Sequence, residues 1–205
     1  MILIGRNLSP FTRRVALWLA HQGRSVERQE LAPVGPDFEE LKKQNPVVRV
    51  PVLILEDGRR LIESFVICDY LDETAPEGTR LIPVSGPARL DCLNRLALAN
   101  STSEKAVALV YERDRRPEDK RWDQWIDRLT GQVEGGLAAM EKAQAAREQL
   151  APRDGGDLAT VIACQFIKTT SPSLMAGEAP ALDALLTRAM DWPGVPETMP
   201  VLPPS

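Results

Sequence analysis

The stretch "PVLILEDGRRLIESFVICDYLDET", residues 51–74, holds two short apolar runs and a segment with helical spacing in close succession. Asp57-Gly58 separates the two runs, and this dipeptide between apolar residues is a strong signal for the tight turn of a β-hairpin. From Ser64 to Thr74, apolar side chains recur at the spacing of a helix. The stretch therefore predicts two antiparallel strands followed by a helix.

Short apolar runs and helical patterns also alternate upstream of this hairpin. Residues 2–5 and 25–31 are predicted strands, with a helix from Phe11 to about Gly23 between them. A short helix over residues 37–46 follows, and its Asn45-Pro46 end is typical of a helix stop. The order βαβαββα predicts a small α/β domain with parallel and antiparallel strands, of a size that suits thiol handling or nucleotide binding.

From about residue 85 the strand signals stop, and long helical patterns rich in alanine, leucine, glutamate and arginine take over. We therefore expect a second, all-helical domain. Within it, Asp154 and Asp157 have the spacing of a capping box at a helix start. The expected helices cover residues 88–113, residues 117–148, a segment that begins after Asp154, and residues 180–190.

The segment "APEGTRLIPVSGP", residues 75–87, has three prolines and two glycines and is the obvious connection. We place the first domain at residues 1–78, the linker at 79–87 and the helical domain at 88–205. The helical domain ends in a proline-rich tail, which we expect to run irregularly along the surface.

Composition narrows the function classes. The 205 residues are 43% hydrophobic and 26% charged, as in globular proteins. No run reaches membrane-spanning length, and the N-terminus lacks the features of a signal peptide, so we expect a cytoplasmic protein. A net charge of -4 and the lack of a basic amphipathic segment argue against binding to nucleic acid or a membrane surface.

The three cysteines, Cys68, Cys92 and Cys164, lie far apart and have no CxxC spacing. This pattern predicts neither a disulfide framework nor a zinc site. We expect each cysteine to act as a small buried apolar residue, and we expect no metal in the protein.

Ser9 precedes Pro10 at the start of the first helix, where three roles are open. It can cap the helix by accepting a backbone N-H, or it can donate from the positive helix end to an anion. A nucleophilic role needs a base, and the single histidine, His21, lies roughly 18 Å further along the same helix. A Ser-His pair within the chain is therefore excluded.

Two further motifs suggest binding groups. If the Val50-Pro51 bond is cis, the backbone of Val50 faces outward and can pair with an extended, peptide-like ligand; the alternative is a simple strand start. Glu63 and Ser64 begin the helix after the hairpin, where free N-H groups can hold a carboxylate and Glu63 can meet an ammonium group. Helix capping alone also explains this pair. Together with Ser9, the motifs describe a site for a small peptide that carries a thiol.

These motifs resemble those of the glutathione S-transferase family, and the resemblance extends from residue 1 to about residue 190. The chain is similar to small bacterial members of the family that have a serine at the catalytic position. The family's fold is a thioredoxin-like N-terminal domain followed by an all-helical domain. The matching residues are Ser9-Pro10-Phe11 with Arg14-Val15, Asn45-Pro46 with Arg49-Val50-Pro51 and Leu53, and Glu63-Ser64 with Ile67.

The resemblance implies a role for each matching position. Ser9 would donate to the glutathione sulfur and favour the thiolate over the thiol. Val50, beside a cis Pro51, would pair with the cysteinyl unit, while Glu63 and Ser64 would hold the γ-glutamyl end. Phe11 and Arg49 complete the implied glutathione-binding residues. An electrophile site would lie between the domains, with Tyr111 as its first candidate.

The resulting hypothesis is a glutathione transferase that conjugates small, largely apolar electrophiles, as in detoxification, and forms a homodimer. Two alternatives stay open. One is a glutathione-dependent thiol reductase, which Ser9 disfavours because serine cannot form a mixed disulfide. The other is a non-catalytic module that binds glutathione or a protein on the same fold. One departure from the family is Val48, where many relatives have glycine; it would narrow the approach to the binding edge.

Overall fold

The computed structural model describes residues 1–147 and 153–202 and divides the chain into two compact units. The first unit consists of Met1–Leu81 together with the chain from Met190 onward, and the second of Ile82–Ala189. The predicted fold class is confirmed, because a small mixed sheet with flanking helices is followed by a set of long helices.

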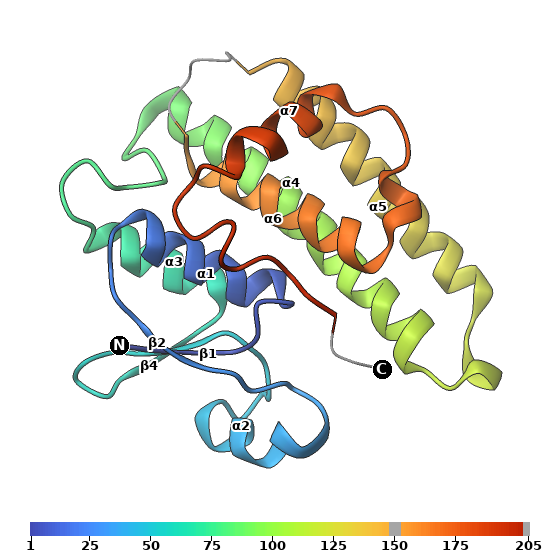
Figure 1. The fold of residues 1–205 in the computed structure, drawn as a ribbon, viewed down its shortest axis with the longest axis horizontal. Helices are drawn as coiled ribbons and strands as arrows, with labels where there is room; N and C mark the ends of the chain where they lie inside the picture. Colours follow the sequence, from blue (N-terminus) through green and yellow to red (C-terminus); the bar gives the residue numbers. More distant parts are fainter. Residues whose placement is uncertain (148–152, 203–205) are drawn as a thin grey trace. The chain divides into compact units, whose positions relative to one another are not determined.

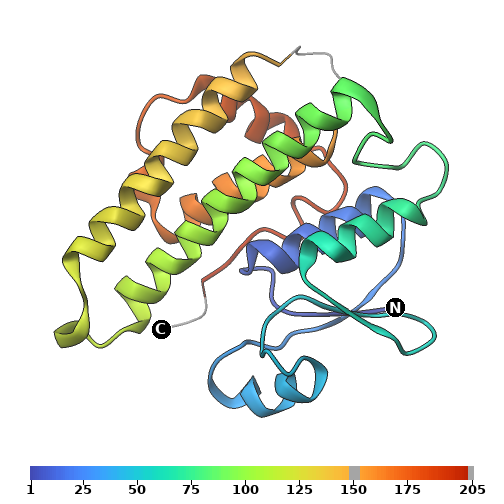
Figure 2. The same ribbon diagram turned by 180° about the vertical axis from the view of Figure 1, so that it is seen from behind.

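The first unit contains a four-stranded sheet with the strand order β2-β1-β3-β4. β1 and β2 are parallel, whereas β1 pairs with β3, and β3 with β4, in antiparallel register. In Figures 1 and 2, α1 and α3 cover one face of this sheet and α2 lies at the other. The elements are β1 Ile2–Ile4, α1 Pro10–His21, β2 Glu27–Gln29, α2 Phe38–Gln44, β3 Val52–Ile54, β4 Arg60–Ile62 and α3 Ser64–Glu73, with a 3-10 turn at Gly35–Asp37.

Alternation along the strands divides the core of the first unit between the two faces of the sheet. Ile4 and Val52 are paired across β1 and β3, and they cluster with Leu41 of α2. The neighbouring pair, Leu3 and Leu53, is fully buried and has the opposite orientation, because successive side chains of a strand alternate. Because of this alternation, β1 and β3 contribute apolar side chains to both faces of the sheet, although each strand has only three residues.

A polar contact joins α1 to α3. The indole N-H of Trp18 and the amide of Gln22 both donate to Oδ1 of Asp72, each at 3.0 Å. The N-H of Leu81 donates to the same oxygen at 3.3 Å. Asp72 thus holds both helices and the end of this part of the chain together.

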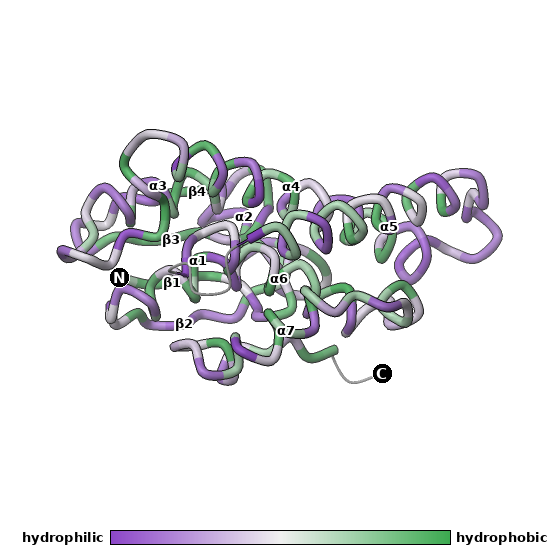
Figure 3. The backbone as a smooth tube through the Cα atoms, turned by 90° about the horizontal axis from the view of Figure 1, so that it is seen from above, coloured by the Kyte–Doolittle hydropathy of each residue, from purple (hydrophilic) through white to green (hydrophobic). Residues whose placement is uncertain are grey.

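The second unit is entirely helical within the residues described. α4 and α5 run alongside each other, and α6 packs against α4. Figure 3 shows hydrophobic colours recurring along α6, in contrast to the hydrophilic connection between α4 and α5. The helices are α4 Gly86–Val110, α5 Asp123–Ala145, α6 Gly155–Thr170 and α7 Pro180–Ala189, with a π-helical turn at Tyr111–Arg115 and 3-10 turns at Glu118–Lys120 and Pro172–Met175.

The start of α6 confirms the predicted capping box. The Asp154 carboxylate accepts from the N-H groups of Gly156 and Asp157, and Asp157 accepts from the Asp154 N-H. The guanidinium of Arg95 lies 2.5 Å from Asp154 and 3.0 Å from Asp157, while Arg147 lies 3.0 Å from Asp157. Two arginines from other parts of the unit therefore neutralise this helix start.

The long helix predicted to begin at residue 117 instead begins at Asp123. Pro117 has an extended conformation, and a single 3-10 turn follows it. The buried carboxylate of Glu112 accepts from the Trp122 N-H at 3.2 Å and from Arg116 at 2.8 Å. These contacts hold the chain in a non-helical path up to Trp122, which delays the helix start.

The tail differs from its expected place in the helical domain, because its described residues belong to the first unit. It is irregular, as predicted, but some of its residues are buried and do not lie on the surface. Val195 is fully buried, and Thr198 is also buried. The side chain of Arg13 on α1 donates to Val195 O and to Thr198 Oγ1, which attaches the tail to the first helix.

Candidate functional site

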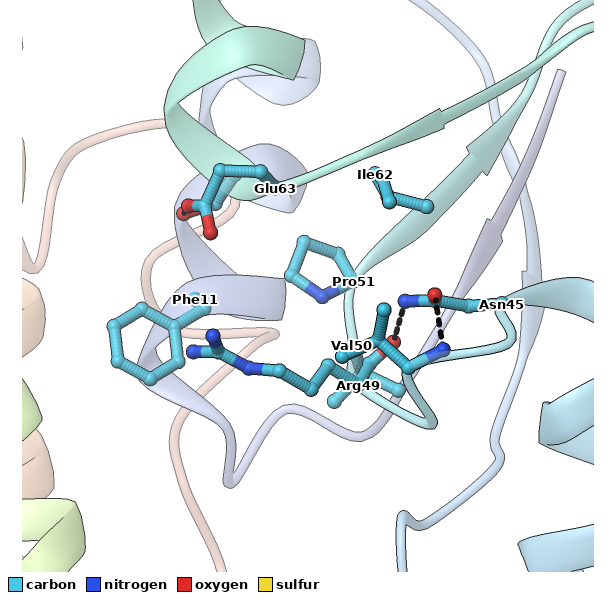
Figure 4. A pocket seen from close by; sticks show the side chains of 9 residues that line it. Phe11, Asn45, Arg49, Val50, Pro51, Ile62 and Glu63 are labelled. Atoms are coloured by element: carbon cyan, nitrogen blue, oxygen red, sulfur yellow. Dashed lines mark hydrogen bonds between the residues drawn. The ribbon is translucent and has the colours of Figure 1, made fainter.

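One pocket of the first unit contains six of the residues that the sequence singles out. Its volume is about 180 Å³, and it lies where the chain enters β3 and where α3 begins. Figure 4 shows the residues around it. The six are Phe11, Arg49, Val50, Pro51, Glu63 and Ser64, and the lining is completed by Asn45, Val47 and Ile62.

The edge of the pocket at β3 is formed by the turn before that strand. Asn45 is buried, donates from Nδ2 to the carbonyl of Arg49 at 2.8 Å, and accepts from the Val47 N-H at 3.0 Å. The peptide bond between Val50 and Pro51 is cis, as the resemblance implies. Asn45 thereby fixes the turn that presents the Val50 backbone, a role that the sequence analysis did not assign to it.

The opposite edge is the start of α3. Ser64 is fully buried, accepts from Nη1 of Arg14 at 2.9 Å, and donates to the Glu63 carboxylate at 3.4 Å. Glu63 is exposed and has a φ of 71°, in the left-handed region. The sequence motif includes Arg14 but gives it no role. In the structure its guanidinium orients Ser64 through this hydrogen bond and lies 5.9 Å from the centre of the Phe11 ring.

The pocket carries both signs of charge. Figure 4 shows the Arg49 guanidinium beside Phe11 and the Glu63 carboxylate directed toward the same space. The N-terminus of α3 adds partial positive charge, and the Glu63 carboxylate caps it by accepting from the Phe65 N-H at 3.5 Å. A ligand with an ammonium group, a carboxylate and a backbone that can pair with Val50 would find a complementary group for each part.

Ser9 is half-buried at the start of α1 and does not line this pocket. Its Oγ accepts from the Thr12 N-H at 3.3 Å, so the helix-capping role is observed. A serine oxygen that accepts a bond still has its own O-H to donate. The donor role toward an anion therefore stays a prediction.

Tyr111 belongs to the second unit, whereas the pocket residues belong to the first. It is the first residue of the π-helical turn after α4, and 45% of its surface is exposed. The guanidinium of Arg115 lies 5.9 Å from its ring centre. Its assignment to an electrophile site stays a prediction.

The cysteines are buried, which argues against a role for any of them as a reactive thiolate. All three cysteines are buried thiols, and burial raises the pKa of Cys92 to about 11 and of Cys164 to about 12. Burial raises the pKa of Cys68 still further. No grouping of three or more histidine, cysteine or acidic side chains within residues 1–147 and 153–202 is arranged to hold a metal ion. None of the helices in those ranges is long and apolar enough to cross a membrane.

A mixed sheet with α1 and α3 on one face, and a cis proline and a helix start at its pocket, defines a thioredoxin-like domain. Residues 3–79 match the family model described as glutathione S-transferase, N-terminal domain. This match identifies residues 3–79 as a glutathione S-transferase N-terminal domain, and the relatives and solved structures below point to the same family.

Two sequence relatives illustrate the extent of the match. The protein named Probable glutathione S-transferase BZ2 of Zea mays is 38% identical over 91 residues, which cover 40% of this chain and 38% of the maize protein. Probable glutathione S-transferase GSTU1 of Oryza sativa subsp. japonica is 29% identical over 112 residues, or 55% of this chain and 48% of that protein. The matched segments thus span less than half the length of these relatives.

Solved structures match over nearly the whole chain. A glutathione S-transferase from Methylobacterium radiotolerans, in complex with glutathione sulfonate, has a TM-score of 0.90 at 25% identity and covers 100% of this chain and 96% of its own. One from Methylobacillus flagellatus with glutathione bound has a TM-score of 0.86 at 28% identity, with 98% and 99% covered. The likeness therefore extends to the helical unit.

Proposed function

We propose that the protein is a glutathione transferase that joins the thiolate of glutathione to small, largely apolar electrophiles. In this reaction the thiol loses its proton to solvent, the sulfur forms a bond to the electrophilic carbon, and the leaving group departs with its electron pair. The observation that carries the proposal is the pocket in which Glu63, Ser64, Arg49 and Val50 come together.

Each group of the pocket suits one part of glutathione. The γ-glutamyl ammonium would meet the Glu63 carboxylate, and its carboxylate would meet Ser64 and the start of α3. The Val50 backbone would pair with the cysteinyl unit, and Arg49 offers a cation to a further carboxylate. The family members crystallised with bound glutathione or glutathione sulfonate support this ligand.

Ser9 would activate the sulfur. Its hydroxyl stands at the positive end of α1, where a donor favours an anion and lowers a thiol pKa that begins at roughly 8.5 for cysteine. Since the Thr12 N-H occupies one lone pair of Oγ, the O-H is available for the sulfur. No metal takes part in the proposed reaction.

An ultraviolet titration of the bound thiol against pH, combined with turnover of an aryl halide, tests this role. We expect the Ser9→Ala variant to lose about 10²- to 10³-fold in kcat, with glutathione affinity changed less than about threefold. The thiolate signal would move to higher pH. Unchanged turnover would remove Ser9 from the mechanism.

Two variants separate loss of the hydroxyl from loss of the helix cap. Ser9→Gly costs a cap only a few tenths of a kcal/mol, and it should show the same loss of turnover. Ser85 also stands at a helix N-cap, that of α4, but its side chain makes no capping bond. Ser85→Ala should leave turnover and the thiol titration unchanged.

A non-catalytic glutathione-binding module is the second candidate, and one observation favours it. Ser9 caps α1 and is absent from the pocket lining, so the serine has a sufficient structural role. Such a module would bind glutathione with an unshifted thiol and show no conjugation. The titration above distinguishes the two functions. A glutathione-dependent reductase is disfavoured, because the three cysteines are buried and Ser9 cannot form a mixed disulfide.

The proposed setting is a cytoplasmic homodimer, as the resemblance implies. Phe65 and Val66 at the start of α3 expose 38% and 53% of their surface, so apolar area is available next to the pocket. Light scattering of the purified protein measures the mass directly, and a monomeric mass would remove the dimer from the proposal.

A further inference from the structure

The loop between β1 and α1 carries Ser9 at its end. Gly5 begins this loop with a φ of 130°, and a Cβ there would clash with the Thr12 side chain and lie 3.0 Å from Val50 Cβ. The Ser9 N-H donates to the Arg6 carbonyl at 3.0 Å, which closes a turn directly before α1. The loop is therefore packed against both α1 and the turn that presents Val50.

The edge strand β2 holds this loop from the other side. The Gln29 carbonyl accepts from the Gly5 N-H at 2.9 Å. The guanidinium of Arg28 donates from Nη2 to the Gly5 carbonyl at 3.2 Å and to Asn7 Oδ1 at 2.8 Å. Two consecutive residues of β2 thus bind both backbone groups of Gly5, and Asn7 fastens the middle of the loop to the same strand.

The sheet directs Arg28 toward the loop. Arg28 pairs with Leu3 in the parallel register of β1 and β2, and paired residues point to the same face of a sheet. Arg28 is half-buried, and its Nε is buried without a hydrogen-bond partner in the described part of the chain. Both hydrogen bonds that its side chain makes there go to the loop. Since a partly buried cation is costly without acceptors, Arg28 and the loop depend on each other.

The cap of α1 alone fixes the Ser9 hydroxyl only loosely. The distance from the Thr12 N-H to Ser9 Oγ is 3.3 Å, which is longer than a typical N-H···O bond. A donor must lie within hydrogen-bond distance of the sulfur, and a misplacement of about 1 Å can cost on the order of 10²-fold in rate. The attachment of the loop to β2 therefore controls how well Ser9 can serve as a donor.

We propose that Arg28 is a positioning residue, which holds the loop through Gly5 and Asn7 so that the Ser9 hydroxyl is directed at the glutathione sulfur. The inference rests on the proposed function, because it names the group that keeps the proposed donor in place. Arg28 lies outside the pocket lining, so it acts on the ionisation of the thiol and not on the affinity for glutathione.

An ultraviolet titration of bound glutathione in Arg28→Met tests this role. We expect the pKa of the bound thiol to rise by about one pH unit and kcat with an aryl halide to fall about tenfold, with glutathione affinity changed less than about twofold. The loss should be smaller than in Ser9→Ala, because the hydroxyl is still present. Amide hydrogen exchange at the Ser9 N-H should become faster, since its turn is no longer held.

Three further variants isolate the contact. Both bonds of Arg28 come from one nitrogen, so a lysine ammonium can replace them, and Arg28→Lys should recover most of the loss. Asn7→Ala should reproduce part of the loss, and adding it to Arg28→Met should cost nothing further. Arg60→Met is the matched control, because Arg60 also lies on an edge strand and donates to an amide oxygen, that of Gln44, at 3.2 Å. It should change neither the titration nor the turnover.

The outcomes separate the two hypotheses. If the parent binds glutathione as a thiolate and folded Arg28→Met titrates like the parent, the positioning role is overturned while the proposed function stands. Should Arg28→Met fail to fold, Asn7→Ala decides: a raised thiol pKa supports the role, and an unchanged one overturns it. A parent with an unshifted thiol would contradict the proposed function, while unchanged exchange at the Ser9 N-H in Arg28→Met would show separately that Arg28 does not hold the loop.

Discussion

The pocket edge of the first unit and the start of α6 in the helical unit differ in two properties. One is the backbone conformation, and the other is the burial and pairing of charged side chains. Among the described residues, the two non-glycine positions with positive φ, Val48 at 52° and Glu63 at 71°, both flank the pocket. At the α6 start, Asp154 has an ordinary extended conformation and caps two N-H groups. The first region is strained, whereas the second is relaxed.

The charges differ in the same sense. Arg95 is 5% exposed; burial alone would lower its pKa, but the hydrogen bond and charge of Asp154 raise that pKa above its usual value. Around the pocket, Arg49 and Glu63 are exposed and face the space that a ligand would fill. Strained backbone persists only where the surroundings over-determine it, and it clusters at functional sites. The comparison therefore supports the proposed ligand binding at the pocket and a role in stability for the α6 start.

The largest effect should come from removing the ion pairs that Arg95 makes at the start of α6. Arg95→Met leaves Asp154 and Asp157 with less compensation in a buried place, and we expect a loss of about 3 to 5 kcal/mol in the free energy of unfolding. Urea denaturation measures this loss. Arg188→Met, on the exposed face of α7, should stay within about 0.5 kcal/mol of the parent. A loss below about 1 kcal/mol for Arg95→Met would contradict the comparison.

An intermediate effect should appear at the strained region, and in binding more than in stability. Glu63→Gly removes the proposed ammonium partner and relieves the positive φ. We expect glutathione affinity to fall by about tenfold or more, while the free energy of unfolding stays equal or rises by about 1 kcal/mol. Calorimetric titration and urea denaturation measure the two quantities. Glu77→Gly, in an exposed loop, is the control for binding.

The smallest effect concerns the backbone at Val48. Its side chain packs on the cluster around Leu41, so any truncation loses that contact. Because φ is positive, Val48→Gly should nevertheless be more stable than Val48→Ala by about 1 kcal/mol. At the neighbouring exposed Val47, alanine should equal or exceed glycine. The same order at both positions in thermal unfolding would show that Val48 is not strained.

Local signals were sufficient for most of the fold. The Asp57-Gly58 hairpin, the helix that Ser64 begins and the Asp154 capping box all depend on residues close in sequence, and all are observed. The start of α5 was missed because Glu112, ten residues earlier, holds the Trp122 N-H. The place of the tail was missed because Arg13 lies 185 positions from Thr198.

The same limit applies to the candidate site. Glu63 and Ser64 could be assigned to a helix start by position alone, and the resemblance supplied the role of Val50 and Pro51. Arg14 and Asn45 stood in the motifs, but their partners Ser64 and Arg49 become apparent only when the chain is folded. Val48 departs from the glycine that many relatives have, and its positive φ supplies the reason for glycine at this position.

The division of the chain also has a consequence for the order of folding during synthesis. The first unit is built from two stretches, and the whole helical unit lies between them in sequence. On a ribosome, β1 through α3 emerge early, but the partners of Arg13 at Val195 and Thr198 emerge only after the helical unit. The buried guanidinium therefore stays without these acceptors until the helical unit has been made, so the first unit to be synthesised is the last to be completed.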